Sequence, residues 1–105
     1  MLKEFAPLNS HDGYYSYNED KLTDNFERLS RAFKSRFQNF DIAYSYKTNY
    51  TPYVCKQLKS LGAIAEVVSD MELDLALKLQ YKGERIIYNG PYKSKKVWKK
   101  HFQTM

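Results

Sequence analysis

Cysteine and histidine are scarce in this chain of 105 residues, which holds one cysteine and two histidines. Cys55 has no partner for an internal disulfide bond. His11 and His101 lie near opposite ends of the sequence and lack the close spacing of metal ligands. We therefore expect these three residues to be structural or surface residues, and we expect no metal site.

Long apolar runs are missing as well. No segment approaches the ~18 consecutive apolar residues of a membrane-spanning helix. The first residues, MLKEFAPLNSHDG, lack the basic segment followed by an apolar segment that marks a secretory signal. We expect a cytoplasmic protein without a membrane partner.

Excess charge is confined to one place. Residues 1–92 carry 12 basic and 12 acidic side chains, so the formal net charge of +5 comes from Lys93, Lys95, Lys96, Lys99 and Lys100. Such a cluster is typical of the solvated face of a last helix. Nucleic-acid binding through these lysines remains an alternative, which a steep loss of binding with salt would support, but we expect no nucleic-acid partner.

Aromatic residues are abundant and favour a folded chain. Hydrophobic residues make up 43% of the sequence and aromatic residues 16%, more than a disordered tail carries. No linker or low-complexity segment divides the sequence. The composition fits one small domain with a modest core.

The first part of the chain predicts a short strand and a long helix. Residues 14–17 (YYSY) have strand composition, and Asn18 is a candidate N-cap for a helix of about five turns. One apolar stripe runs along this helix, by which we expect it to pack: Leu22, Phe26, Leu29, Phe33 and Phe37.

The rest of the chain predicts a strand-helix repeat. Strands at 41–48, 63–68 and 85–88 begin about 21 residues apart, each followed by a helix. The helix signals are Thr51-Pro52 as a start, Gly62 as a stop, the capping box from Ser69 to Glu72, and Ser94. Such a repeat indicates an α/β fold with a parallel sheet, and three strands suggest an incomplete (β/α) barrel.

Lys47 is the candidate catalytic residue. It ends the strand DIAYSYKT, in which Ile42, Tyr44 and Tyr46 alternate with Ala43, Ser45 and Lys47. Active sites of parallel α/β folds lie at the carboxyl ends of the strands, and the small residues beside Lys47 leave room for a ligand. Its amine could form a Schiff base. Alternatively, Lys47 is a surface lysine at the end of a strand.

Three segments together resemble a known family: YSYKTNYTPYVCKQL (44–58), AEVVSDMEL (65–73) and IIYNGPYKS (86–94). They have the order and spacing of the amino-terminal part of the pyridoxal-phosphate-dependent (fold-type III) diaminopimelate and ornithine decarboxylases. The resemblance covers nearly the whole chain, from YYSYNEDKL to the helix after Ser94.

The resemblance implies roles for individual residues. The lysine of the Y-x-x-K-x-N segment, which matches Lys47, is catalytic and binds the cofactor pyridoxal 5'-phosphate. An aspartate of the second strand, close to the cofactor, matches Glu66, which is one methylene longer; Glu66 as a solvent-facing residue is the alternative. Met71 replaces a usual glycine. The turn Asn89-Gly90-Pro91 either redirects the chain or contacts the ligand.

The resemblance also implies the fold, the oligomeric state and the reaction of the complete protein. An alanine racemase-like TIM barrel needs about 250 residues, so we expect residues 1–105 to be the amino-terminal portion of the cofactor-binding barrel, a fragment without the phosphate-binding loop. The intact enzyme is expected to be a homodimer that decarboxylates a basic or dibasic amino acid, and the fragment alone to be inactive. A non-catalytic binding or regulatory module derived from the same barrel is the alternative.

Overall fold

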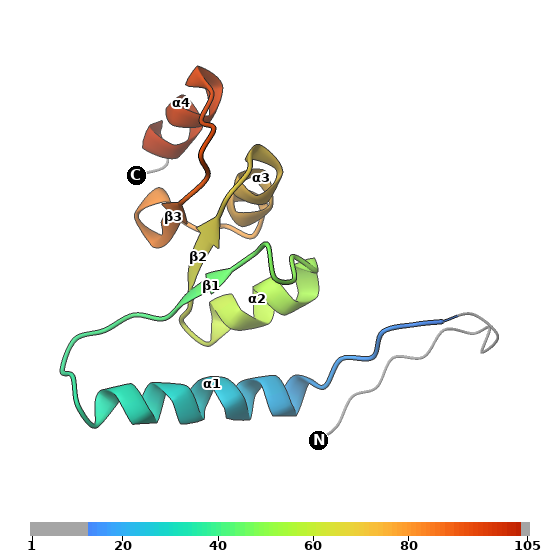
Figure 1. Cartoon of the computed structure of the whole chain (residues 1–105), viewed down its shortest axis with the longest axis vertical. Coiled ribbons are helices and arrows are strands. Elements are labelled where there is room, and N and C mark those ends of the chain that lie inside the picture. The colour runs from blue at the N-terminus through green and yellow to red at the C-terminus, as the bar shows by residue number, and fades with distance from the viewer. Residues whose placement is uncertain (1–12, 104–105) are drawn as a thin grey trace. The chain divides into compact units, whose positions relative to one another are not determined.

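The computed structural model describes residues 13–103, so His11 lies outside the described residues. The chain divides into two compact units, residues 1–40 and residues 41–105 (Figure 1). In the described part, no helix has the length and apolar character needed to cross a membrane.

The first unit contains helix α1, Glu19–Lys34. Asn18 caps it as predicted, because its side-chain oxygen accepts a hydrogen bond of 2.9 Å from the backbone nitrogen of Lys21. The helix ends before Phe37, which we expected to belong to its stripe; the Ser35 hydroxyl donates to the Ala32 carbonyl at that end. No residue of α1 is buried, so the packing of the stripe stays a prediction.

The strand expected at residues 14–17 is absent, and that prediction was wrong. A strand needs a neighbouring strand for its backbone N–H and C=O groups. Between residues 13 and 103, no segment forms a ladder with this one, so strand composition alone leaves it irregular.

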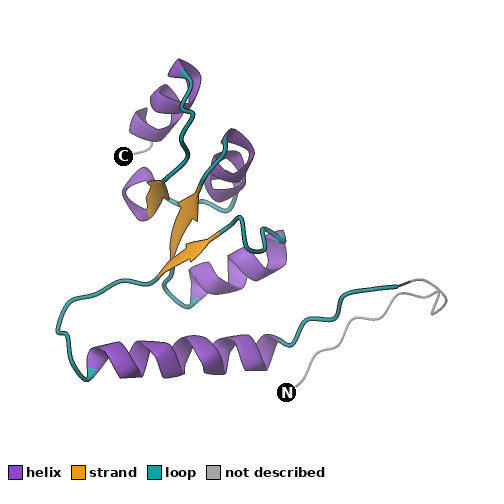
Figure 2. Cartoon of the chain, in the orientation of Figure 1, coloured by secondary structure: helices purple, strands orange, loops and turns teal. Residues whose placement is uncertain are grey.

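The second unit is built on a parallel sheet of three strands in the order β1-β2-β3. The strands are β1 (Ala43–Ser45), β2 (Ile64–Val67) and β3 (Ile86–Tyr88). A helix follows each strand along the chain, as Figure 2 shows: α2 (Pro52–Ser60), α3 (Asp70–Lys78) and α4 (Lys95–Gln103), with a 3₁₀ turn η1 (Gly83–Arg85) before β3. The predicted α/β repeat with parallel strands is confirmed.

Most helix ends follow the predicted signals. Gly62 lies just beyond α2 with φ +102°, a conformation that favours glycine. The Ser69 hydroxyl accepts a hydrogen bond from the Glu72 backbone nitrogen at the start of α3, and Ser94 does the same for Val97 in α4. Thr51 stands at the N-cap position of α2, but its side chain makes no capping bond.

Helices α2 and α3 bury one face of the sheet. The buried core includes Tyr46, Cys55, Ala65, Val67, Leu73, Ala76, Ile86 and Val97. The strand register places five other residues on the opposite face: Ala43, Ser45, Ile64, Glu66 and Ile87. None of these five is buried, and Ile87 is 47% exposed. The sheet therefore has a packed apolar face and an open face.

Candidate functional site

Lys47 lies just past the end of β1, in a turn formed by residues 46–48. The strand is shorter than predicted and stops at Ser45, because the backbone closes on itself there: the Thr48 nitrogen donates to the Ser45 carbonyl at 3.2 Å. Lys47 is exposed. Within the described part of the chain, no group is hydrogen bonded or ion paired to its amine. The amine is therefore accessible to a ligand.

The strand that leads to Lys47 has the predicted alternation of faces. Tyr46 is 1% exposed and packs in the helix-side core, whereas Ala43 is exposed. Ser45 is half-buried on the open face, and its hydroxyl oxygen is buried without a hydrogen-bond partner among the described residues. Small side chains and one unpaired hydroxyl group thus lie on the strand before Lys47.

Glu66 lies on the neighbouring strand β2, on the same open face. It is in register with Ser45, and its carbonyl oxygen accepts a hydrogen bond of 3.0 Å from the Tyr46 backbone nitrogen. This bond ties β2 to the residue directly before Lys47. The structure therefore brings the two candidate residues, Lys47 and Glu66, to adjacent strands at the carboxyl edge of the sheet.

Asn89 extends this edge from β3. Its backbone nitrogen donates to the Val67 carbonyl at 2.8 Å, and its side-chain nitrogen lies 3.5 Å from Oε1 of Glu66, a long hydrogen bond. The turn of Asn89, Gly90 and Pro91 therefore does more than redirect the chain. The sequence left open whether this turn redirects the chain or contacts a ligand, and the ligand contact stays a prediction. The hydrogen bond between Asn89 and Glu66 depends on strand register and was not predicted.

Lys93 stabilises the turn after β3 through its ammonium group. Its ammonium group donates to the Gly90 carbonyl at 2.9 Å and lies 5.4 Å from the Tyr88 ring centre and 5.9 Å from the Trp98 ring centre. Such cation–π contacts favour a fixed ammonium group. Lys93 is therefore a structural residue of this turn, unlike the exposed Lys95, Lys96 and Lys99.

Two more ionisable groups lie in the core behind this edge. Burial raises the pKa of the Cys55 thiol to about 11 and raises the pKa of the Tyr46 phenol above its ordinary value. Both groups keep their protons at neutral pH. Cys55, which is fully buried, is thus not a nucleophile, in agreement with the structural role expected from its sequence.

Glu72 belongs to the helix cap and not to the site. Its Oε2 accepts a hydrogen bond of 3.0 Å from the Ser69 hydroxyl, and the residue is 5% exposed. Across residues 13–103, no cluster of His, Cys, Asp and Glu side chains could hold a metal ion.

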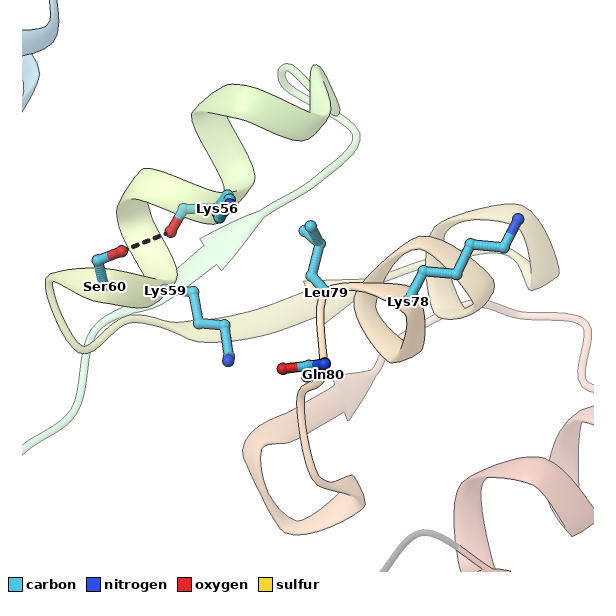
Figure 3. Close-up of a pocket in the computed structure, with 6 residues that line it drawn as sticks. All are labelled: Lys56, Lys59, Ser60, Lys78, Leu79 and Gln80. Atoms are coloured by element: carbon cyan, nitrogen blue, oxygen red, sulfur yellow. Dashed lines mark hydrogen bonds between the residues drawn. The ribbon is translucent and has the colours of Figure 1, made fainter.

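A cleft of about 400 Å³ lies elsewhere, between the carboxyl ends of α2 and α3. It is lined by Lys56, Lys59, Ser60, Lys78, Leu79 and Gln80. Figure 3 shows that the Lys78 side chain extends away from Lys59 instead of converging with it. Lys59 and Lys78 stand in the last turns of their helices, where a positive charge offsets the helix dipole. The presence of Lys59 and Lys78 at this cleft is therefore explained by the stability of their helices, without a ligand.

Comparisons with known proteins agree with the resemblance found in the sequence. Residues 23–103 match the family described as "Pyridoxal-dependent decarboxylase, pyridoxal binding domain". The chain is 38% identical over 82 residues to the diaminopimelate decarboxylase of Aquifex aeolicus. The aligned segment covers 78% of this chain and 19% of the relative. It is 33% identical over 85 residues to that of Methanocaldococcus jannaschii, covering 77% of this chain and 19% of the relative.

A third relative, the diaminopimelate decarboxylase of Methanothermobacter thermautotrophicus, is 32% identical over 76 residues, covering 72% of this chain and 18% of the relative. The chain thus spans about a fifth of the length of the curated relatives that it matches. No solved structure matches it.

Proposed function

The chain belongs to the family of pyridoxal-dependent decarboxylases, and we propose that it forms the first part of their cofactor-binding barrel, with Lys47 as the residue that binds pyridoxal phosphate. The observation that carries the proposal is the position of Lys47. Its unpaired amine lies directly beyond β1, at the carboxyl edge of a parallel sheet. That edge is where α/β folds and barrels bind their ligands.

The residues around Lys47 fit the part of the cofactor that bonds to a lysine. A primary amine is the group that an aldehyde requires, and within residues 13–103 this one has no competing ion pair. Ala43 and Ser45 are small residues on the open face of β1, and the Ser45 hydroxyl has no hydrogen-bond partner among the described residues. Pyridoxal phosphate, when bound, supplies an aldehyde for attachment and a ring that accepts the electrons left when carbon dioxide departs.

Lys47 and Glu66 have separate roles in this proposal. The amine of Lys47 would hold the cofactor through its aldehyde, and Nζ of Lys47 would accept or return a proton during the reaction. Glu66 contributes a carboxylate on the next strand, which the Asn89 amide holds at 3.5 Å. A carboxylate there favours a positively charged partner group and so orients the bound ligand.

The proposed reaction is the decarboxylation of a basic or dibasic amino acid by the complete barrel enzyme. The family and the name of the relatives, diaminopimelate decarboxylase, support this substrate class. The open sheet face supports an incomplete barrel, because parallel sheets are normally covered on both faces. We also propose that the complete enzyme is a cytoplasmic homodimer, as the resemblance implies.

The test is to locate the cofactor on the protein expressed from its complete reading frame. Pyridoxal phosphate is added, the bond to lysine is reduced with borohydride, and the mass increment is mapped on peptides. We expect the increment on Lys47, with loss in Lys47→Ala.

Lys95→Ala and Lys96→Ala are the matched controls, because these lysines are exposed like Lys47 but lie on α4. Both variants should keep the label on Lys47. Label spread evenly over exposed lysines, or no label, would reject the decarboxylase function in favour of a binding module.

A further inference from the structure

The segment that carries Lys47 is anchored at three points. The Tyr46 nitrogen bonds to the Glu66 carbonyl on β2, and the Thr48 nitrogen closes the turn onto Ser45. Both bonds involve the backbone before and within the turn. The third anchor depends on the side chains of Tyr44 and Asn49, and it connects the residues on the two sides of Lys47.

Tyr44 provides one half of this third anchor. From the helix-facing side of β1, its hydroxyl group donates a hydrogen bond of 2.8 Å to the carbonyl oxygen of Asn49. Burial raises the pKa of the Tyr44 phenol, so the hydroxyl keeps the proton that it donates. The bond joins residues three before and two after Lys47 and leaves the open face of the strand clear.

Asn49 provides the other half. Its side-chain Oδ1 accepts hydrogen bonds from the Thr51 backbone nitrogen, at 3.0 Å, and from the Thr51 hydroxyl, at 2.7 Å. This Asx turn leads directly into α2, which begins at Pro52. Asn49 thus fixes the exit of the segment while its carbonyl oxygen receives Tyr44.

We infer that Tyr44 and Asn49 are positioning residues for Lys47: through their mutual hydrogen bond and the Asx turn, they hold its backbone in the geometry needed for cofactor attachment. The inference rests on the proposed function. It also gives a physical reason for the spacing Y-x-x-K-x-N, because the first and last residues of that segment bond to each other around the lysine.

The experiment compares single-group variants of the protein expressed from its complete reading frame. Tyr44→Phe removes one hydroxyl group. Its matched control is Tyr81→Phe, because the Tyr81 hydroxyl also donates to a backbone carbonyl at 2.8 Å, that of Ala63 at the other edge of the sheet. Asn49→Ala removes the Asx turn, and Asn49→Asp keeps an oxygen acceptor and should rescue it.

Two measurements are made on each variant. The first is the concentration of pyridoxal phosphate that gives half-maximal borohydride-trapped label on Lys47. The second is the hydrogen-exchange rate of the backbone amides at residues 46–49. A lost hydrogen bond of about 1 kcal/mol corresponds to about fivefold in an equilibrium constant. We therefore expect Tyr44→Phe and Asn49→Ala to raise the half-maximal concentration and the exchange rate by about fivefold, with Asn49→Asp and Tyr81→Phe close to the unmodified protein.

The outcomes separate this inference from the proposed function. Faster exchange in Tyr44→Phe with unchanged labelling of Lys47 would mean a purely structural bond and would overturn the inference. Unchanged exchange and labelling would overturn it as well, and the proposed function would stand. Absence of label on Lys47 in the unmodified protein would reject the function and the inference together.

Discussion

Gly90 approaches Val68 so closely that a Cβ atom at position 90 would lie 2.3 Å from the Val68 carbonyl oxygen. The same atom would lie 2.8 Å from a ring carbon of Tyr88. Two of the chain's strand ends, those of β2 and β3, are in contact here through backbone atoms. Only glycine fits between them.

Gly90→Ala is therefore expected to reduce the free energy of unfolding by about 1 to 3 kcal/mol, because the backbone of one strand end must shift. Urea unfolding followed by circular dichroism measures the change. Gly13→Ala is the control, since nothing lies within 4 Å of a Cβ there, and it should change stability by less than about 0.5 kcal/mol. Equal stability of the two variants would contradict the close approach.

Leu73→Ala tests the helix-side core. Leu73 is fully buried in α3, and truncation of such a residue costs about 2–5 kcal/mol through lost contacts and a cavity. Met71→Ala on the same helix is the control, because Met71 is 53% exposed and should cost less than about 0.5 kcal/mol. The order of the two losses, measured by thermal unfolding, would be reversed if α3 packed by another face.

Ser69→Ala should cost more than Ser94→Ala, although both remove an N-cap. Loss of a cap alone costs about 1 kcal/mol, which is our expectation for Ser94. Ser69 also donates to the buried Glu72 side chain, so its loss leaves a buried polar group with one hydrogen-bond donor fewer, and we expect about 2 to 4 kcal/mol. Denaturant midpoints of the two variants decide this, and equal losses would show that the hydroxyl of Ser69 does not stabilise Glu72.

The pKa of Cys55 predicts a pH dependence of stability. In the unfolded chain the thiol ionises near its ordinary value of 9.0, whereas burial raises the pKa to about 11 in the folded chain. Its contribution is therefore complete below pH 9 and is lost as the pH rises to about 11. In Cys55→Ala this contribution is missing, so the difference in unfolding free energy between the two proteins should shrink over this range. A constant difference would contradict the raised pKa.

Local signals in the sequence predicted much of this fold. The N-caps Asn18, Ser69 and Ser94 and the stop at Gly62 act within one turn of their own position, so three or four residues are enough to recognise them. The alternation around Tyr46 predicted correctly which face of β1 meets the helices. Strand lengths were less accurate, because a strand ends where its ladder ends and the ladder depends on another segment.

In the candidate site, too, local features were predicted from the sequence and contacts between distant segments were not. Lys47 was identified from the sequence together with the family resemblance, and its role stays a prediction. The bond between Asn89 and Glu66 joins residues on different strands, and its geometry follows from a register that no local pattern encodes. Thr51 was expected to cap α2 with its side chain, but it donates hydrogen bonds to the upstream Asn49 instead. This pairing depends on the path of the loop, which no local pattern encodes.

The sequential order β1-β2-β3 has a consequence for how the chain is made. Each strand pairs with the one synthesised just before it, so the helix-side core can assemble on the ribosome as soon as β3 and α4 have emerged. During that time the face that remains uncovered carries Ser45 and Glu66 as well as apolar residues. The carboxyl group of Glu66 makes this face less apolar, and we therefore expect the nascent sheet to be less prone to associate with other unfinished chains than a wholly apolar face would be.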